Sequence, residues 1–182
     1  MQSPPEGAVA GRALRRVLYT KEDIAARVAE MGREITLAYP EEEELLVLGL
    51  LKGSFIFLAD LVREIARPIH VDFLVAASYG TGTVSSGEVR LVYDPEVDVA
   101  GKHVLLVEDI IDSGRTIDRL VPLLRGRGPR SLELCALLHK RIARSAVLEA
   151  RWVGFEPPPE FLIGYGLDHS ENYRNLPFIA SL

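Results

Sequence analysis

The stretch "VLLVEDIIDSGRT", residues Val104 to Thr116, decides the fold class of this chain. An apolar run reaches two adjacent carboxylates, Glu108 and Asp109, resumes for two residues and then breaks at an Asp-Ser-Gly turn. The uninterrupted apolar run predicts a strand that is covered on both faces. Like charges placed so close repel each other, and a buried carboxylate without a partner is unfavourable. Three acids within five residues at the end of such a strand therefore require an explanation.

Similar apolar runs recur along the chain and alternate with helical patterns. Strands are expected at residues 45–51, 70–78, 89–94, 103–109 and 131–138, followed by two short apolar runs at 151–155 and 161–168. Helices are expected at 20–39, 55–66 and 114–126, with a short helical piece near 143–150. Strands that alternate with helices predict an α/β domain with a mainly parallel sheet.

The bulk properties narrow the class of protein. At 182 residues the chain is expected to form one domain, residues 12–182, after a Pro/Gly/Ser-rich tail at 1–11 that we expect to be disordered. The net charge of −5 argues against a nucleic-acid or membrane partner, because such partners need a basic face. One cysteine, Cys135, excludes an internal disulfide. With no secretory signal and no long apolar stretch, we expect a cytoplasmic protein.

Polar breaks follow four of the expected strands, and they predict a common site. They are "LKGS", "SYG", "EDIIDSGRT" and "HKR". In open parallel sheets, ligands bind beyond the carboxyl ends of the strands, so these groups can converge on one crevice. A helix that starts after "DSG" would present backbone N–H groups of residues 113–116, with the Ser113 and Thr116 hydroxyls, to a phosphate. A simple capped helix is the alternative interpretation.

The acids suit a phosphorylated sugar. Beside a phosphate, carboxylates are expected to bind hydroxyl groups or a metal, and Mg²⁺ would offset the combined negative charge. Glu108 and Asp109 would then hold two ribose hydroxyls, and Asp112 would remain for proton transfer or charge stabilisation. No Walker A loop and no dinucleotide-binding glycine motif follows a strand, so ATPase and hydride-transfer chemistry are unsupported.

The stretch resembles the 5-phosphoribosyl-1-pyrophosphate (PRPP) binding signature of the type I phosphoribosyltransferases. That signature is an apolar strand, two acids, two apolar residues, Asp-Ser/Thr-Gly, a variable residue and Thr, and Arg115 stands at the variable position. The resemblance implies the type I fold, a mainly parallel twisted sheet flanked by helices, with a small hood built from terminal segments. We expect the hood to come mainly from about 150–182, and residues 108, 109 and 112–116 to bind PRPP.

Two further segments resemble the 6-oxopurine branch of this family, the hypoxanthine-guanine phosphoribosyltransferases. "LLKGSFIF" resembles the pyrophosphate loop, in which the peptide bond before the lysine is often cis, and implies that Lys52 and Gly53 contact pyrophosphate. "SYGTGTVSSGEV", residues 78–89, resembles the mobile lid that closes over the reacting centre, and places Ser78 and Tyr79 in it.

The purine side of the site is implied by two more segments. "LLHKRIARS" places Lys140 where an ammonium would donate to the exocyclic oxygen of a 6-oxopurine. In "VGFEPPPEFLIGYGLDHSENYRNLP", Phe161 would stack on the purine and the Leu162 backbone would read its edge. Asp168 would lie at the purine site and hold Mg²⁺ with Glu108 and Asp109, and Arg174 would face the pyrophosphate. For each, a core or surface role is the alternative.

The resemblance implies a Mg²⁺-dependent enzyme of purine salvage that moves the 5-phosphoribosyl group from PRPP to N9 of hypoxanthine, and also of guanine. Preference among hypoxanthine, guanine and xanthine is left open, and a homodimer or homotetramer is expected. A PRPP-binding regulator of the same fold, such as an RNA-binding attenuator, is the main alternative. A phosphate-binding structural protein is a weaker one.

Overall fold

The computed structural model describes residues 14–78, 89–140 and 147–182. The expected disordered tail, Tyr79 and the rest of the expected lid up to residue 88 lie outside this description. Of Ser78 only the backbone is described, as the last residue of a strand.

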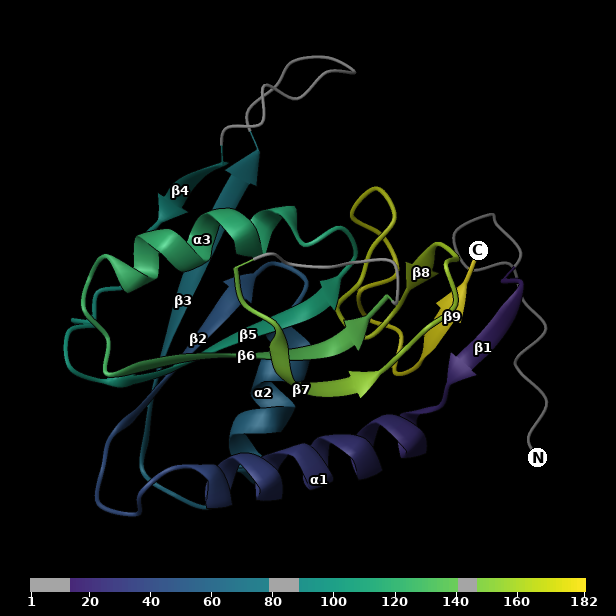
Figure 1. Cartoon of the computed structure of the whole chain (residues 1–182). Helices are drawn as coiled ribbons and strands as arrows, with labels where there is room; N and C mark the ends of the chain where they lie inside the picture. The colour runs from purple at the N-terminus through teal and green to yellow at the C-terminus, as the bar shows by residue number, and fades with distance from the viewer. Residues whose placement is uncertain (1–13, 79–88, 141–146) are drawn as a thin grey trace.

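A six-stranded sheet forms the centre of the molecule (Figure 1). Its strands, in the order β4-β3-β2-β5-β6-β7, are β4 (Val89–Tyr93), β3 (Ile69–Ser78), β2 (Leu45–Leu51), β5 (His103–Ile111), β6 (Ser131–His139) and β7 (Ala150–Phe155). Only β4 runs antiparallel to its neighbour within this described sheet. The prediction of a mainly parallel sheet is therefore confirmed, and the carboxyl ends of five strands meet at one edge.

Helices cover both faces of this sheet (Figure 1). They are α1 (Lys21–Ala38) and α2 (Phe55–Glu64) on one face and α3 (Arg115–Arg125) on the other. Alternate residues of β2 belong to different cores: Leu45 and Val47 pack in the α1/α2 core, and Leu46 and Leu48 in the α3 core. Burial on both faces explains why β2 is apolar throughout. No helix in the described part of the chain is long and apolar enough to cross a membrane.

A second, three-stranded antiparallel sheet forms the hood. Its order is β1-β9-β8, with β1 (Arg16–Tyr19), β8 (Leu162–Ile163) and β9 (Ile179–Ser181). The hood differs from the expected one in its boundary, because β7 belongs to the main sheet through parallel pairing with β6. The buried Trp152 of β7 packs near Tyr39, which ties this strand to the α1 side of the core. The N-terminal strand β1 belongs to the hood instead.

The helical piece expected near 143–150 is wrong in its described part. Residues 147–149 form no regular structure and β7 begins at Ala150, while 141–146 lie outside the description. Val147 and Leu148 pack against the α3 core, and this burial accounts for the apolar pattern. The predicted helix after the Asp-Ser-Gly turn is confirmed and continues through Pro122.

Candidate active site

The acid pair lies inside β5 rather than at its end, because the strand continues two residues beyond the expected end at 109, to Ile111. Successive side chains of a strand point to opposite faces. Glu108 accordingly lines a pocket with residues of the β5–α3 turn, whereas Asp109 meets the loop after β2. The two neighbouring carboxylates thus serve two different parts of the same sheet edge.

Glu108 is a buried carboxylate, 9% exposed. Its pKa lies well above the usual range because burial disfavours the charged form, and the adjacent Asp109 adds to the rise. No ion pair within 4 Å compensates it among the described residues. A hydrogen bond from a hydroxyl group, or a nearby cation, would stabilise the charged form of a carboxylate in this setting.

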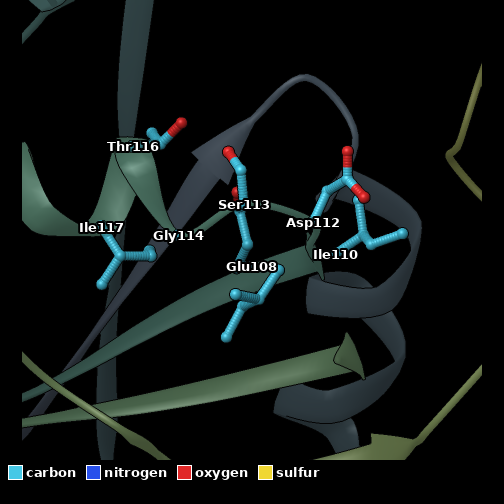
Figure 2. Close-up of a pocket in the computed structure, with 8 residues that line it drawn as sticks. Glu108, Ile110, Asp112, Ser113, Gly114, Thr116 and Ile117 are labelled. Carbon is cyan, nitrogen blue, oxygen red and sulfur yellow. The ribbon is translucent and has the colours of Figure 1, made fainter. Parts of the chain in front are cut away.

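The turn between β5 and α3 forms a small pocket of about 70 Å³ (Figure 2). Gly114 precedes the helix with φ of +76°, a conformation that glycine adopts without steric cost. No side chain caps the N-terminus of α3, so its first backbone N–H groups are free to receive a ligand. The pocket is lined by residues of the strand, the turn and the helix: Glu108, Ile110, Ile111, Asp112, Ser113, Gly114, Thr116 and Ile117. Arg115, at the start of the helix, is exposed.

Asp112 and Lys140 form an ion pair, with 2.7 Å between Lys140 Nζ and Asp112 Oδ1. Lys140 follows the end of β6, and its backbone N–H donates to the Ile111 carbonyl at 3.1 Å. The lysine side chain is only 14% exposed, whereas that of Asp112 is 63% exposed. The structure therefore brings together two residues that sequence reasoning assigned to proton transfer and to purine recognition.

The loop after β2 packs directly on Asp109. The Leu51–Lys52 peptide bond is cis, as the resemblance implied. A Cβ on Gly53 would lie 1.7 Å from Asp109 Oδ2, so this contact requires glycine. Burial raises the pKa of Asp109 to about 6, against hydrogen bonds from the Ile110 and Asp109 backbone N–H groups that lower it.

A turn of the hood, residues 164–174, completes this side of the site. Arg174 donates to Asp168 Oδ1 at 2.8 Å and to the Gly166 carbonyl at 2.7 Å. Gly166, with φ of +100°, lies so close to Gly53 that a Cβ would be 2.1 Å from the Gly53 carbonyl oxygen. Lys52, Gly53 and Arg174, the residues expected at pyrophosphate, are thus on adjoining loops.

Two residues of this turn were not singled out by sequence reasoning. Glu171 contacts both Lys52, at 3.0 Å, and Arg174, at 3.2 Å. Tyr165, 6% exposed, donates its hydroxyl to Asp60 of α2 at 2.6 Å and so fixes the turn to the helix that follows the loop after β2. An exposed glutamate and a tyrosine between two glycines carry no sequence signal that would have distinguished them.

Phe161, the expected purine-stacking residue, lies immediately before the hood strand β8. Phe161 is 54% exposed, large for an aromatic side chain, and contacts the edge of His169 with ring centroids 5.3 Å apart. Leu162 is buried in β8 and pairs with Ser181 of β9. Phe161 is therefore available to a ligand, and Leu162 contributes its backbone in a fixed strand.

No three Asp, Glu, His or Cys side chains in the described segments are grouped closely enough to hold a metal by themselves. Mg²⁺ usually takes only one or two carboxylates from a protein and completes its shell with water and substrate phosphates. The desolvated Asp109, and Asp168 across the adjoining loops, are hard oxygen donors of this kind. The residues present fit a cation that arrives with a phosphorylated substrate.

Comparisons with known proteins all identify similarity to phosphoribosyltransferases. The phosphoribosyl transferase domain profile matches residues 17–170. The chain is 45% identical to the hypoxanthine phosphoribosyltransferase of Haemophilus influenzae, over 91% of this chain and 94% of that protein. It is 43% identical to the hypoxanthine-guanine phosphoribosyltransferase of Dictyostelium discoideum, over 92% and 95%. The crystal structure of a hypoxanthine phosphoribosyltransferase from Staphylococcus aureus superimposes with a TM-score of 0.87 at 42% identity, covering 93% of this chain and 91% of that one.

Proposed function

This chain belongs to the phosphoribosyl transferase family, in its hypoxanthine phosphoribosyltransferase branch, and from that premise we propose that it transfers the 5-phosphoribosyl group of PRPP to N9 of hypoxanthine and guanine. The products are the purine nucleotide and pyrophosphate, and the role is purine salvage. The Asp112–Lys140 pair beside the open helix N-terminus carries the proposal, because it joins a base-recognition group to a phosphate-binding turn.

The 5′-phosphate binds at the start of α3. The uncapped backbone N–H groups of residues 113–116 donate to its oxygens, and the Ser113 and Thr116 hydroxyls add two donors. Glu108 and Asp109 accept hydrogen bonds from the ribose hydroxyls. Hydroxyl donors suit carboxylates whose pKa burial has raised, because they supply the hydrogen bonds that water no longer provides.

The purine lies between Phe161 and the Asp112–Lys140 pair. The Lys140 ammonium donates a hydrogen bond to O6, and the amino group of adenine could not accept this hydrogen bond. The Leu162 backbone forms hydrogen bonds with the base edge. When the base binds, Asp112 is released from Lys140. It then accepts the proton from N7 as N9 becomes bonded to the ribose. Lys52, Gly53 and Arg174 hold the leaving pyrophosphate, and the lid that contains Ser78 and Tyr79 excludes water.

Mg²⁺ is the proposed cofactor, held by Asp109 and Asp168, with Glu108 nearby in the same acidic set. When bound, it supplies charge neutralisation at the pyrophosphate. The proposal extends to a cytoplasmic homodimer or homotetramer, in keeping with the family resemblance.

The decisive experiment offers PRPP with hypoxanthine, guanine, xanthine, adenine or uracil, each with Mg²⁺ and again with excess chelator. We expect nucleotide from hypoxanthine and guanine, none from adenine or uracil, and none in any chelated reaction. Turnover of adenine would contradict the role of Lys140. Turnover of xanthine alone would favour a xanthine enzyme, and PRPP binding without turnover of any base would favour a regulator.

A further inference from the structure

The carboxylate of Glu171 occupies the space between two cations. One oxygen, Oε1, lies 3.0 Å from Lys52 Nζ, and the other, Oε2, lies 3.2 Å from an Arg174 guanidinium nitrogen. Both cations are the proposed partners of pyrophosphate. A glutamate that bridges them with its two oxygens makes the contacts that two oxygens of a phosphate would make.

The backbone that carries Glu171 is held in place by its contacts. Ser170 and Glu171 have φ of +54° and +64°, values that residues with a side chain rarely adopt. The Glu171 N–H donates to Asp168 Oδ2 at 2.8 Å, and His169 and Asn172 pair across the turn. Local preference alone would not place this carboxylate over the loop that contains Lys52.

Of the two carboxylates that contact Arg174, Glu171 is the one that a ligand can displace more easily. Asp168 uses both of its oxygens, one for Arg174 and one for the Glu171 N–H, and its side chain is 29% exposed. The Glu171 side chain is 66% exposed and can rotate into water without moving the backbone. A ligand that needs the Arg174 guanidinium therefore displaces Glu171 before Asp168.

We propose that Glu171 is an internal competitor of pyrophosphate. Its carboxylate pairs with Lys52 and Arg174 before pyrophosphate binds, and pairs with them again when pyrophosphate leaves. This inference rests on the proposed function, because it takes these two cations as the pyrophosphate site. By competing for the same cations, Glu171 weakens the binding of pyrophosphate and favours its release. It is a residue that sets affinity, and it touches none of the reacting atoms.

The test measures binding of pyrophosphate by calorimetry in Mg²⁺ buffer, with the full chain and its Glu171→Gln variant. Glutamine removes the charge and keeps the size of the side chain. Exposed ion pairs contribute modestly, so loss of two competing contacts should lower the Kd of pyrophosphate by about 3- to 10-fold. The matched control is Glu44→Gln, which breaks an exposed pair with Lys102 far from this loop and should leave the Kd unchanged.

Two outcomes would overturn the inference. An unchanged Kd would mean that Glu171 does not compete, and a higher Kd would mean that it organises Lys52 and Arg174 for the ligand. Glu171→Asp, which keeps the charge but is too short to bridge both cations, should fall between wild type and Glu171→Gln. If the wild type binds pyrophosphate and the variants match it, only this inference fails; if the wild type binds none, the proposed function fails with it.

Discussion

The two ends of the six-stranded sheet carry acidic residues in opposite electrostatic settings. At the amino ends of the strands, Glu43 pairs with Arg130 at 2.6 Å and also contacts His103, while Glu44 pairs with Lys102 at 2.6 Å. At the carboxyl ends, Glu108 and Asp109 are more deeply buried, and burial raises the pKa of both. Glu43 and Glu44 are thus paired with cations of their own edge. Glu108 and Asp109 have no ion pair among the described residues, although Asp112 at the same edge is paired with Lys140.

This difference separates stability from function within one sheet. Ion pairs at the amino edge contribute modestly to the folded state. Desolvated carboxylates at the carboxyl edge oppose folding, and such groups concentrate where a ligand will compensate them. Changing matched residues at the two edges should therefore separate effects on activity from effects on stability.

The largest effect is expected at Asp112. The Asp112→Asn variant could not accept the proton that we propose Asp112 takes from the purine, so its kcat should fall by about 10²- to 10⁴-fold. Asp94→Asn is the control: it breaks an exposed pair with Arg127 at the other edge, at 2.7 Å, and should keep wild-type turnover. Steady-state kinetics with hypoxanthine measures both. Wild-type kcat in Asp112→Asn would remove this residue from proton transfer.

Gly53→Ala should disrupt the loop after β2, which we propose binds pyrophosphate. The added Cβ would collide with the Asp109 carboxylate, so the loop must shift, and a displacement of about 1 Å can cost about 10²-fold in kcat/KM for PRPP. Gly126→Ala, at the amino edge, brings its Cβ no closer than 3.4 Å to the Pro122 carbonyl oxygen and should change little. Equal kinetics in the two alanine variants would show that the tight contact at Gly53 has no part in catalysis.

Replacing Lys140 should weaken the binding of the purine base more than the binding of PRPP. Lys140→Met removes the charged hydrogen bond that we propose to O6, so the KM for hypoxanthine should rise by about 10- to 100-fold, while the KM for PRPP should stay within about twofold. Lys102→Met breaks the pair with Glu44 and should leave both values unchanged. A proportional rise in both KM values for Lys140→Met would indicate a general structural defect in place of base recognition.

The smallest effect concerns stability and should have opposite signs at the two edges. Asp109→Asn keeps an acceptor for the Ile110 N–H but removes a desolvated charge, so the free energy of unfolding should rise by about 1 kcal/mol at neutral pH. Glu43→Gln loses its pairs with Arg130 and His103, and the same quantity should fall by about 1 kcal/mol. Urea denaturation in metal-free buffer measures both. The same sign for both variants would contradict the contrast between the edges.

β5, the turn after it and α3 could be predicted from the sequence because their signals are local. An apolar run, a glycine with positive φ and a helix start follow one another within a few residues. The hood was harder to predict, because β1, β8 and β9 have two to four residues each and β1 pairs with β9 across nearly the whole chain. The apolar residues at 147–148 indicated a helix, whereas in the structure they are partly buried and pack against the α3 core without forming one.

The residues of this sequence by themselves determined the doubly covered strands and the acidic turn, since these depend on hydrophobic periodicity and on neighbours in the chain. Only the tertiary structure decided that Glu108 and Asp109 face different loops, that Gly53 adjoins both Asp109 and Gly166, and that Glu171 bridges Lys52 and Arg174. The contacts of Gly53 with Asp109 and Gly166, and of Glu171 with Lys52, join segments more than fifty residues apart. Their distances depend on how the hood turn packs against the sheet edge, and no local pattern of residues encodes that packing.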